Sequence, residues 1–230
     1  MKPTATTGII LARIDFGEAD RILTVLTPDY GKLHLIAKGV RRVRSKLAGG
    51  IELFSVSDIT FVRGRHELGT LVSARLQTYY DHIVKDLDRT LAGYELIKLL
   101  NRYTEDNTET AYFELLHTAL ESLNNPDIAL PLIRTWFMAR IISLSGHSPN
   151  LLRDNLGRQL QPGRRYAFDV DSMAFSEAAD GPYEERQVKL LRLIFGRLSP
   201  GRLQSVQHSE GLIATLAPLV ETMLMTHIRL

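Results

Sequence analysis

The chain contains no cysteine among its 230 residues. Disulfide bonds, thiolate nucleophiles and cysteine-ligated zinc are therefore excluded. No apolar run approaches the roughly 18 residues that suggest a membrane-spanning helix. The first eight residues, MKPTATTG, also lack the apolar core of a signal peptide. We therefore expect a cytoplasmic protein, and the missing cysteines fit that reducing compartment.

Signatures of catalysis are missing as well. The chain has no G-x-x-x-x-G-K-S/T segment, and no G-x-G-x-x-G follows a predicted strand. The triplet Asp15-Phe16-Gly17 matches a kinase signature by chance, because no catalytic-loop motif accompanies it. The seven histidines include no pair spaced at i, i+4, so a helical zinc site is unsupported. We expect no enzyme and no cofactor.

A short acidic cluster follows the first predicted strand and consists of Asp15, Glu18 and Asp20. Converging carboxylates of this kind suit a hard divalent cation. The alternative is a solvated turn in which Glu18 or Asp20 pairs with Arg21 or with a neighbouring strand. We expect this second arrangement, and no bound metal.

Charge is distributed unevenly along the chain. Residues 1–80 contain 12 Lys/Arg and seven Asp/Glu, whereas residues 81–230 contain 16 and 19. The overall net charge of +2 therefore hides a basic module joined to a mildly acidic one. With 44% hydrophobic and 23% charged residues, the composition is that of an ordinary globular protein.

The first 80 residues carry the signals of short strands. Thr7–Ile14 is almost continuously apolar, and Lys32–Lys38 alternates between apolar and polar residues. Pro28 and Gly31 mark a turn between two such segments. The expected strands are 7–14, 21–27, 32–38, 52–62 and 68–78. Five short strands with no helical period between them predict a small barrel.

From residue 81 onward, apolar residues recur every three to four positions, which predicts helices. The first such stripe is Ile83, Leu87, Leu91, Tyr94 and Ile97. Residues 149–182 lose this period and predict an irregular insertion with one hairpin around Tyr166–Phe175. We expect an α+β protein with a barrel domain at 1–80 and a helical domain at 81–230.

The densest positive charge lies in residues 30–51, which contain six basic residues and no acidic one. They are Lys32, Lys38, Arg41, Arg42, Arg44 and Lys46. Lys32 and Lys38 share one face of their predicted strand, and Gly39 and Gly49–Gly50 bracket an expected flexible loop. Arginine suits bidentate contact with phosphate. Arg63 and Arg65 lie on another turn of the same module.

This concentration of charge indicates a site for a phosphate backbone. Tyr30 and His34 could stack on bases beside it. The alternative interpretations are a solvated charged face for the loop and ordinary surface positions for these two rings.

Residues 8–50 resemble the N-terminal domain of the RecO family of bacterial recombination mediators. The resemblance rests on an ordered set of motifs, namely Gly8, Gly17-Glu18-x-Asp20, Thr27 through Gly31-Lys32, Ala37-Lys38-Gly39, Arg41-Arg42 and Ser45-x-Leu47-x-Gly49. It continues more loosely through Leu53-Phe54 into the helical half. There, Phe137-x-x-Arg140-Ile141-Ile142 with Gly146 and Pro149 resembles the family's central helix and its exit.

The resemblance implies an N-terminal OB-fold and a non-enzymatic protein that binds single- and double-stranded DNA. It further implies annealing of complementary strands and assistance in loading recombinase onto strands coated by single-strand binding protein. The implied partners are RecR and the C-terminal tail of the single-strand binding protein, and the implied location is the nucleoid. Many members hold zinc through four cysteines, which Leu151–Gly181 lacks, so zinc is not expected here.

Site residues follow from the charge pattern and the resemblance together. The candidates for DNA binding are Lys32, Lys38, Arg41, Arg42, Arg44, Lys46, Arg63 and Arg65. Arg140 and Trp136 are the candidates for binding the protein tail. A core-edge or intramolecular salt-bridge role is the alternative for Arg140. The alternative for the whole chain is a protein-interaction adaptor whose basic loop binds an acidic protein partner.

Overall fold

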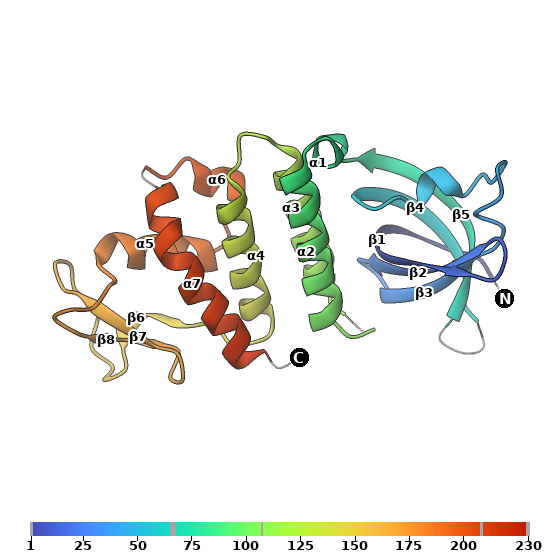
Figure 1. The fold of residues 1–230 in the computed structure, drawn as a ribbon. Coiled ribbons are helices and arrows are strands. Elements are labelled where there is room, and N and C mark those ends of the chain that lie inside the picture. Colours follow the sequence, from blue (N-terminus) through green and yellow to red (C-terminus); the bar gives the residue numbers. More distant parts are fainter. Residues whose placement is uncertain (1, 65–67, 107, 208, 229–230) are drawn as a thin grey trace. The chain divides into compact units, whose positions relative to one another are not determined.

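The computed structural model describes residues 2–64, 68–106, 108–207 and 209–228 (Figure 1). The chain divides into two compact units, Met1–Asn124 and Asn125–Leu230. Within the described ranges, no helix is both long and apolar enough to cross a membrane.

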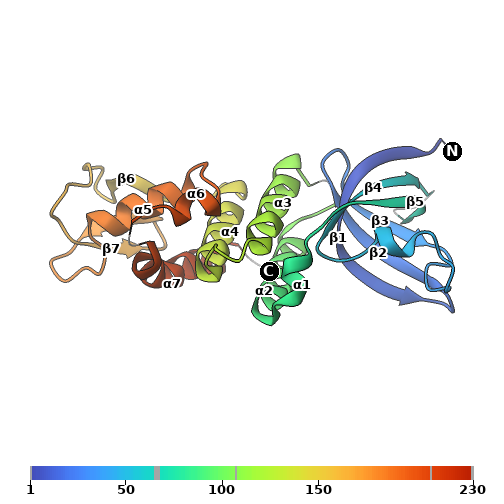
Figure 2. The same cartoon turned by 90° about the horizontal axis from the view of Figure 1, so that it is seen from above.

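The first unit begins with a closed five-stranded barrel (Figure 2). Its strands are β1 (Thr4–Phe16), β2 (Asp20–Thr27), β3 (Gly31–Ala37), β4 (Ser55–Val62) and β5 (Leu68–Tyr79). Their order around the barrel is β1-β2-β3-β5-β4, with β3 and β5 parallel and the other pairs antiparallel. This is the arrangement of an OB-fold, so the predicted α+β class and barrel are confirmed.

The long first strand closes the barrel. Thr4–Ile9 pairs with β4, and Ile9–Phe16 pairs with β2. The register shifts between Ile10 and Ala12, and such a bulge bends a strand enough to serve two neighbours. Alternate residues then fill the interior, where Leu23 and Phe61 are completely buried. Each side chain of this kind stabilises the fold by about 1.5–3 kcal/mol through burial alone.

Three helices complete the first unit: α1 (Asp81–Lys85), α2 (Leu87–Tyr103) and α3 (Thr110–Asn124). The Asp86 carboxylate caps α2 by accepting a hydrogen bond from the Arg89 backbone N–H. The helices were predicted, but part of the predicted buried face was wrong, because Leu87 and Leu91 are 73% and 50% exposed. Gly93 lies against the Phe54 ring instead, where a Cβ atom would come within 2.6 Å.

The second unit is built around α4 (Leu130–Leu144), which packs against α5 (Glu185–Phe195), α6 (Pro200–Gln204) and α7 (Ser209–His227). Helix α4 has buried residues on several of its sides, as expected of a central helix, and they include Trp136, Phe137 and Ile141. Pro218 lies inside α7.

Residues 149–182 contain a three-stranded sheet of β6 (Asn150–Asp154), β7 (Tyr166–Asp169) and β8 (Ala174–Glu177), in the order β6-β8-β7. The strands β7 and β8 form a hairpin at the predicted place. Strand β6, which pairs with β8 in parallel, was not predicted because its sequence has no alternation.

Candidate nucleic-acid interface

The basic segment forms the connection between β3 and β4, and its base is fixed to the turn between β1 and β2. The Gly39 N–H donates to the Asp20 carboxylate at 2.7 Å, and the Arg41 N–H donates to the Ala19 carbonyl at 2.9 Å. Gly39 has a φ of 65°, in the left-handed region that glycine adopts without strain. Val40 and Ile51 are buried in the barrel core and hold the two ends of the loop.

The acidic cluster serves this anchoring. Asp15, rather than Glu18 or Asp20, forms the ion pair with Arg21, at 2.8 Å, whereas Asp20 accepts from the Gly39 N–H just beyond β3, close to the predicted alternative of a neighbouring strand. The hydrogen bond from Arg21 lowers the pKa of the Asp15 carboxyl, and the charge of Arg41 lowers it further. In the described part of the chain, no group of three or more potential ligands could hold a metal ion.

Arg41 itself is partly neutralised. Its Nε lies 3.5 Å from an Asp15 carboxylate oxygen, and its Nη1 donates to the Gly17 carbonyl at 3.5 Å. Arg41 therefore lies back along the turn between β1 and β2, and only part of its charge is available to a ligand.

Four cations of this loop are open to solvent, and we call Lys38, Arg42, Arg44 and Lys46 the open basic loop. Their side chains make no hydrogen bond or ion pair with any described residue. Val43, between two of the arginines, is fully exposed. The loop therefore presents uncompensated positive charge to an approaching anion.

Lys32 lies in a different environment. Its Nζ donates to the Asn101 carbonyl of α2 at 3.0 Å, and its backbone N–H donates to the Asp106 carbonyl at 2.9 Å. Burial lowers the pKa of the Lys32 ammonium, while the nearby charge of Asp106 opposes that shift. Lys38 lies beyond the last residue of β3, so the predicted common strand face of the two lysines does not form.

A cavity of about 300 Å³ opens beside β3 and brings together four of the residues singled out from the sequence. They are Tyr30, Lys32, His34 and Arg63. The Arg63 guanidinium lies over the Tyr30 ring, 5.2 Å from its centroid. Arg65 lies outside the described residues. Asp106 also lines the cavity, and it was missed because its position depends on how α2 and α3 pack beside the barrel.

The two candidates for partner binding both contact the chain that follows α5. The Trp136 Nε1–H donates to the Leu198 carbonyl at 2.9 Å, and Arg140 Nη1 donates to the Gly196 carbonyl at 3.1 Å. Burial lowers the pKa of the Arg140 guanidinium, and the charge of Arg197 lowers it further. Arg140 therefore makes an intramolecular contact, through a hydrogen bond to a carbonyl.

Comparison with known proteins matches both parts of the chain. The family model described as recombination protein O N terminal matches residues 1–80, and the model described as recombination protein O C terminal matches residues 84–230.

Individual relatives agree with these models. The DNA repair protein RecO of Rubrobacter xylanophilus is 35% identical over 144 residues, or 63% of this chain and 58% of the relative. That of Dehalococcoides mccartyi is 33% identical over 147 residues, or 64% and 57%. That of Streptomyces griseus is 32% identical over 171 residues, or 71% and 68%. The chain thus spans less than two thirds of the first two relatives. The chain belongs to the RecO family, and the three relatives described above are named DNA repair proteins.

Proposed function

We propose that this chain is a non-enzymatic mediator of recombination in DNA repair that binds and anneals single-stranded DNA. The observation that carries the proposal is the open basic loop on an OB-fold barrel, with four solvent-exposed cations. OB-folds of this kind bind oligonucleotides on their strands and loops. Membership of the RecO family supports the same role.

The proposed mechanism is electrostatic. Each cation that neutralises a phosphate releases condensed counterions, and this release supplies most of the sequence-independent affinity. The loop base is already fixed by the Gly39 and Arg41 backbone contacts, so less ordering is needed on binding. Two strands held on one positive surface repel each other less, which assists annealing. Binding to double-stranded DNA follows from the same phosphate contacts.

The wider role we propose is assistance in loading recombinase onto strands coated by single-strand binding protein, with RecR as a partner. The second unit offers Arg140 for the acidic C-terminal tail of the single-strand binding protein, whereas Trp136, the other candidate, is buried beside it with its indole N–H bonded to the Leu198 carbonyl. Arg140 has no carboxylate contact within the described residues, so its charge would be available to that tail. A DNA-bound mediator of this kind is cytoplasmic and associated with the nucleoid.

An alanine triple variant tests the DNA site. Replacing Arg41, Arg42 and Arg44 should weaken single-strand binding and reduce the slope of log affinity against log salt by up to about 2, at about 0.7 per contact. The matched control replaces Arg75, Lys98 and Arg102, three exposed cations outside the loop, and removes the same charge. Unchanged affinity and slope in the loop variant would exclude this loop as the DNA site.

The second candidate function is a protein-interaction adaptor, favoured by the same uncompensated charge. Titration of a short single strand and of an acidic peptide ending in phenylalanine, each at two salt concentrations, separates the two functions. An adaptor binds only the peptide, whereas the mediator that we propose binds the strand with strong salt dependence.

A further inference from the structure

The cavity beside β3 has an apolar floor and a polar rim. Leu35 and Phe61, both buried, lie at the floor. The rim carries three groups of different hydrogen-bonding character, namely Lys32, His34 and Asp106. Its volume of about 300 Å³ falls at the lower end of the range typical of small-molecule sites. The cavity thus suits a flat, partly apolar group with polar atoms along one edge.

An aromatic ring forms one wall. The Tyr30 ring meets the Phe61 ring edge to face, with 5.6 Å between centroids and 77° between planes, and this contact fixes its orientation. The planar guanidinium of Arg63 lies over the same ring at 5.2 Å from the centroid. Because Arg63 is exposed, a stacking ligand can displace its guanidinium toward solvent, where it can contact a phosphate.

The rim contains both donors and an acceptor. The Lys32 ammonium has three N–H donors, and its described partners are the two oxygen atoms of Asn101, at 3.0 and 3.4 Å. The His34 Nε2 lies 3.4 Å from the Asp106 carboxylate, which is half-exposed and accepts hydrogen bonds. A carboxylate at this position repels phosphate but accepts hydrogen bonds from an amino group.

The segment that carries Asp106 is held in place before any ligand binds. The Lys32 N–H bonds the Asp106 carbonyl at 2.9 Å, and the Thr110 hydroxyl donates to the Pro28 carbonyl at 2.8 Å. Gly31, with a φ of 63°, allows this close approach, because a Cβ atom there would lie 2.3 Å from the Asp106 carbonyl oxygen. A preorganised rim lowers the entropic cost of binding.

We propose that this cavity receives one unstacked nucleobase of a bound single strand and prefers cytosine or guanine to thymine. The Asp106 carboxylate accepts from the amino group of the base, Lys32 and His34 donate to its carbonyl, and Tyr30 provides the stacking surface. Thymine has no amino group, and its one ring N–H lies between two carbonyls, so a carboxylate that accepts from it also faces a carbonyl oxygen. The inference rests on the proposed function, since the bound strand supplies the base.

The test uses the whole ¹⁵N-labelled chain titrated separately with dCMP, dGMP, dTMP and inorganic phosphate, followed through backbone amide resonances. We expect dCMP and dGMP to shift the amides of Gly64 and Gly69, which line the cavity, at about fivefold lower concentration than dTMP. Inorganic phosphate should leave these two amides unchanged. Equal responses to all three nucleotides, a response to phosphate alone or no response would overturn the proposal.

Two variants with the same change in charge sharpen the test. Asp106→Ala should bring the dCMP and dGMP responses down to that of dTMP, because the acceptor is gone. Glu105→Ala removes a charge from the neighbouring residue, which does not line the cavity, and should keep the preference. A preference that survives in Asp106→Ala would also overturn the proposal.

Different results would contradict the nucleobase site and the DNA-binding function. The triple alanine variant of Arg41, Arg42 and Arg44 should weaken strand binding yet keep the preference among free mononucleotides. Absence of strand binding in the unaltered chain would contradict the proposed function. Normal strand binding with no mononucleotide preference would contradict only the nucleobase site.

Discussion

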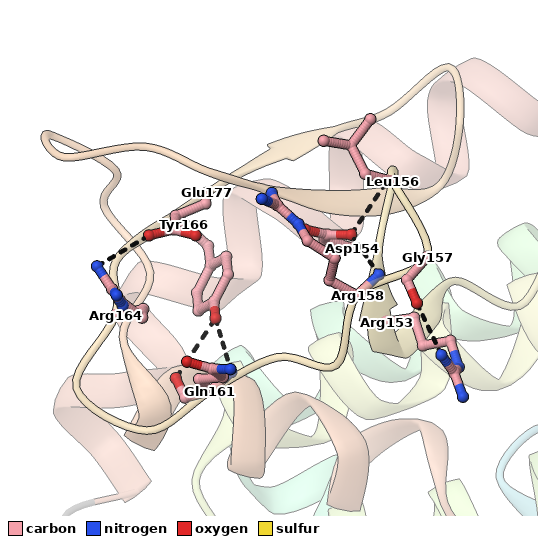
Figure 3. Close-up of polar contacts among 9 residues, drawn as sticks. All are labelled: Arg153, Asp154, Leu156, Gly157, Arg158, Gln161, Arg164, Tyr166 and Glu177. Atoms are coloured by element: carbon pink, nitrogen blue, oxygen red, sulfur yellow. Dashed lines mark hydrogen bonds and ion pairs between the residues drawn. The ribbon is translucent and has the colours of Figure 1, made fainter.

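Two sets of four cations in this chain have opposite surroundings. The open basic loop contains Lys38, Arg42, Arg44 and Lys46, and the insertion contains Arg153, Arg158, Arg164 and Arg165. Every arginine of the second set has a partner. Arg153 contacts the Gly157 carbonyl at 2.7 Å, Arg158 contacts Asp154 at 2.7 Å and Arg164 contacts Glu177 at 3.2 Å (Figure 3). Arg165 contacts Glu184 at 2.9 Å. The loop cations have no partner among the described residues.

The difference shows that the number of charges in a segment does not identify a binding surface. In the insertion, carboxylates pair with three of the arginines and a carbonyl accepts from Arg153, and these contacts contribute to local structure. In the loop, the cations face solvent, and their charge acts on whatever approaches. Whether a carboxylate or carbonyl lies within reach of a cation decides which of these two roles its charge has.

The largest effect is expected when Asp154, in the insertion, is replaced. The buried Asp154 carboxylate accepts from the Leu156 N–H at 3.0 Å, the Arg158 N–H at 2.8 Å and the Arg158 Nε at 2.7 Å (Figure 3). Asp154→Ala leaves these donors unpaired and should lower the melting temperature by several degrees without changing DNA affinity. Asp171→Ala, at an exposed position of the same segment, is the control in thermal unfolding. Equal melting temperatures for the two variants would contradict this role of Asp154.

Matched pairs of arginines compare the two segments directly. Arg42→Ala with Arg44→Ala should reduce single-strand affinity about tenfold and the salt slope by about 1.4, with little change in stability. Arg164→Ala with Arg165→Ala removes the same charge but should leave affinity and slope nearly unchanged. Fluorescence anisotropy with a labelled strand at several salt concentrations measures both. Similar losses of single-strand affinity in the two double variants would contradict the idea that intramolecular partners keep the arginines of the insertion from binding DNA.

A smaller effect is expected when the loop receives an internal partner. Val43→Glu places a carboxylate between Arg42 and Arg44 at a fully exposed position where no packing is lost. Single-strand affinity should fall about threefold, since a surface ion pair is worth only about 0.2–1 kcal/mol and must be broken for binding. Val43→Thr is the neutral control, and an equal loss there would implicate the valine side chain itself.

The smallest effect is expected on the melting temperature when pH is varied across the neutral range. Burial alone would raise the pKa of the Asp154 carboxyl, but the backbone and side-chain hydrogen bonds from Arg158 outweigh it and lower the pKa. A lowered pKa in the folded state stabilises the fold above the unfolded value of about 3.9, and this contribution is lost as pH falls through the folded pKa. The melting temperature should therefore change little between about pH 8 and about pH 5, and fall steeply below about pH 4. A midpoint of loss near neutral pH would contradict this assignment.

The sequence predicted the barrel better than the helical faces, for physical reasons. Alternation along Lys32–Lys38 and the turn at Pro28 depend on neighbours in the chain, so β2 and β3 were found nearly in place. The stripe through Leu87 and Leu91 was misleading, because Phe54, just before β4, packs against α2 at Gly93, where a side chain would not fit.

Only part of the candidate site could be predicted from the sequence, again because a local pattern does not report contacts between distant residues. The open cations follow one another in the chain, and the local pattern was enough to single them out. The partners of Lys32 and Arg41 depend on tertiary packing. Asn101 and Asp106 are distant in sequence from Lys32, and Asp15 is distant from Arg41, so no local pattern connects them. Arg41 and Arg42 are adjacent in sequence, yet only Arg41 reaches Asp15.

The fixed base and the solvent-facing cations of the loop also have a kinetic consequence. A charge that no neighbour neutralises extends its field outward by about one Debye length, roughly 8–10 Å at moderate salt, before any atom of a ligand makes contact. Because the Gly39 and Arg41 backbones hold the loop at its root, that field has a constant direction relative to the barrel. Added salt should therefore slow the encounter with a strand more than it hastens the departure, and the loop would act first as a guide for association.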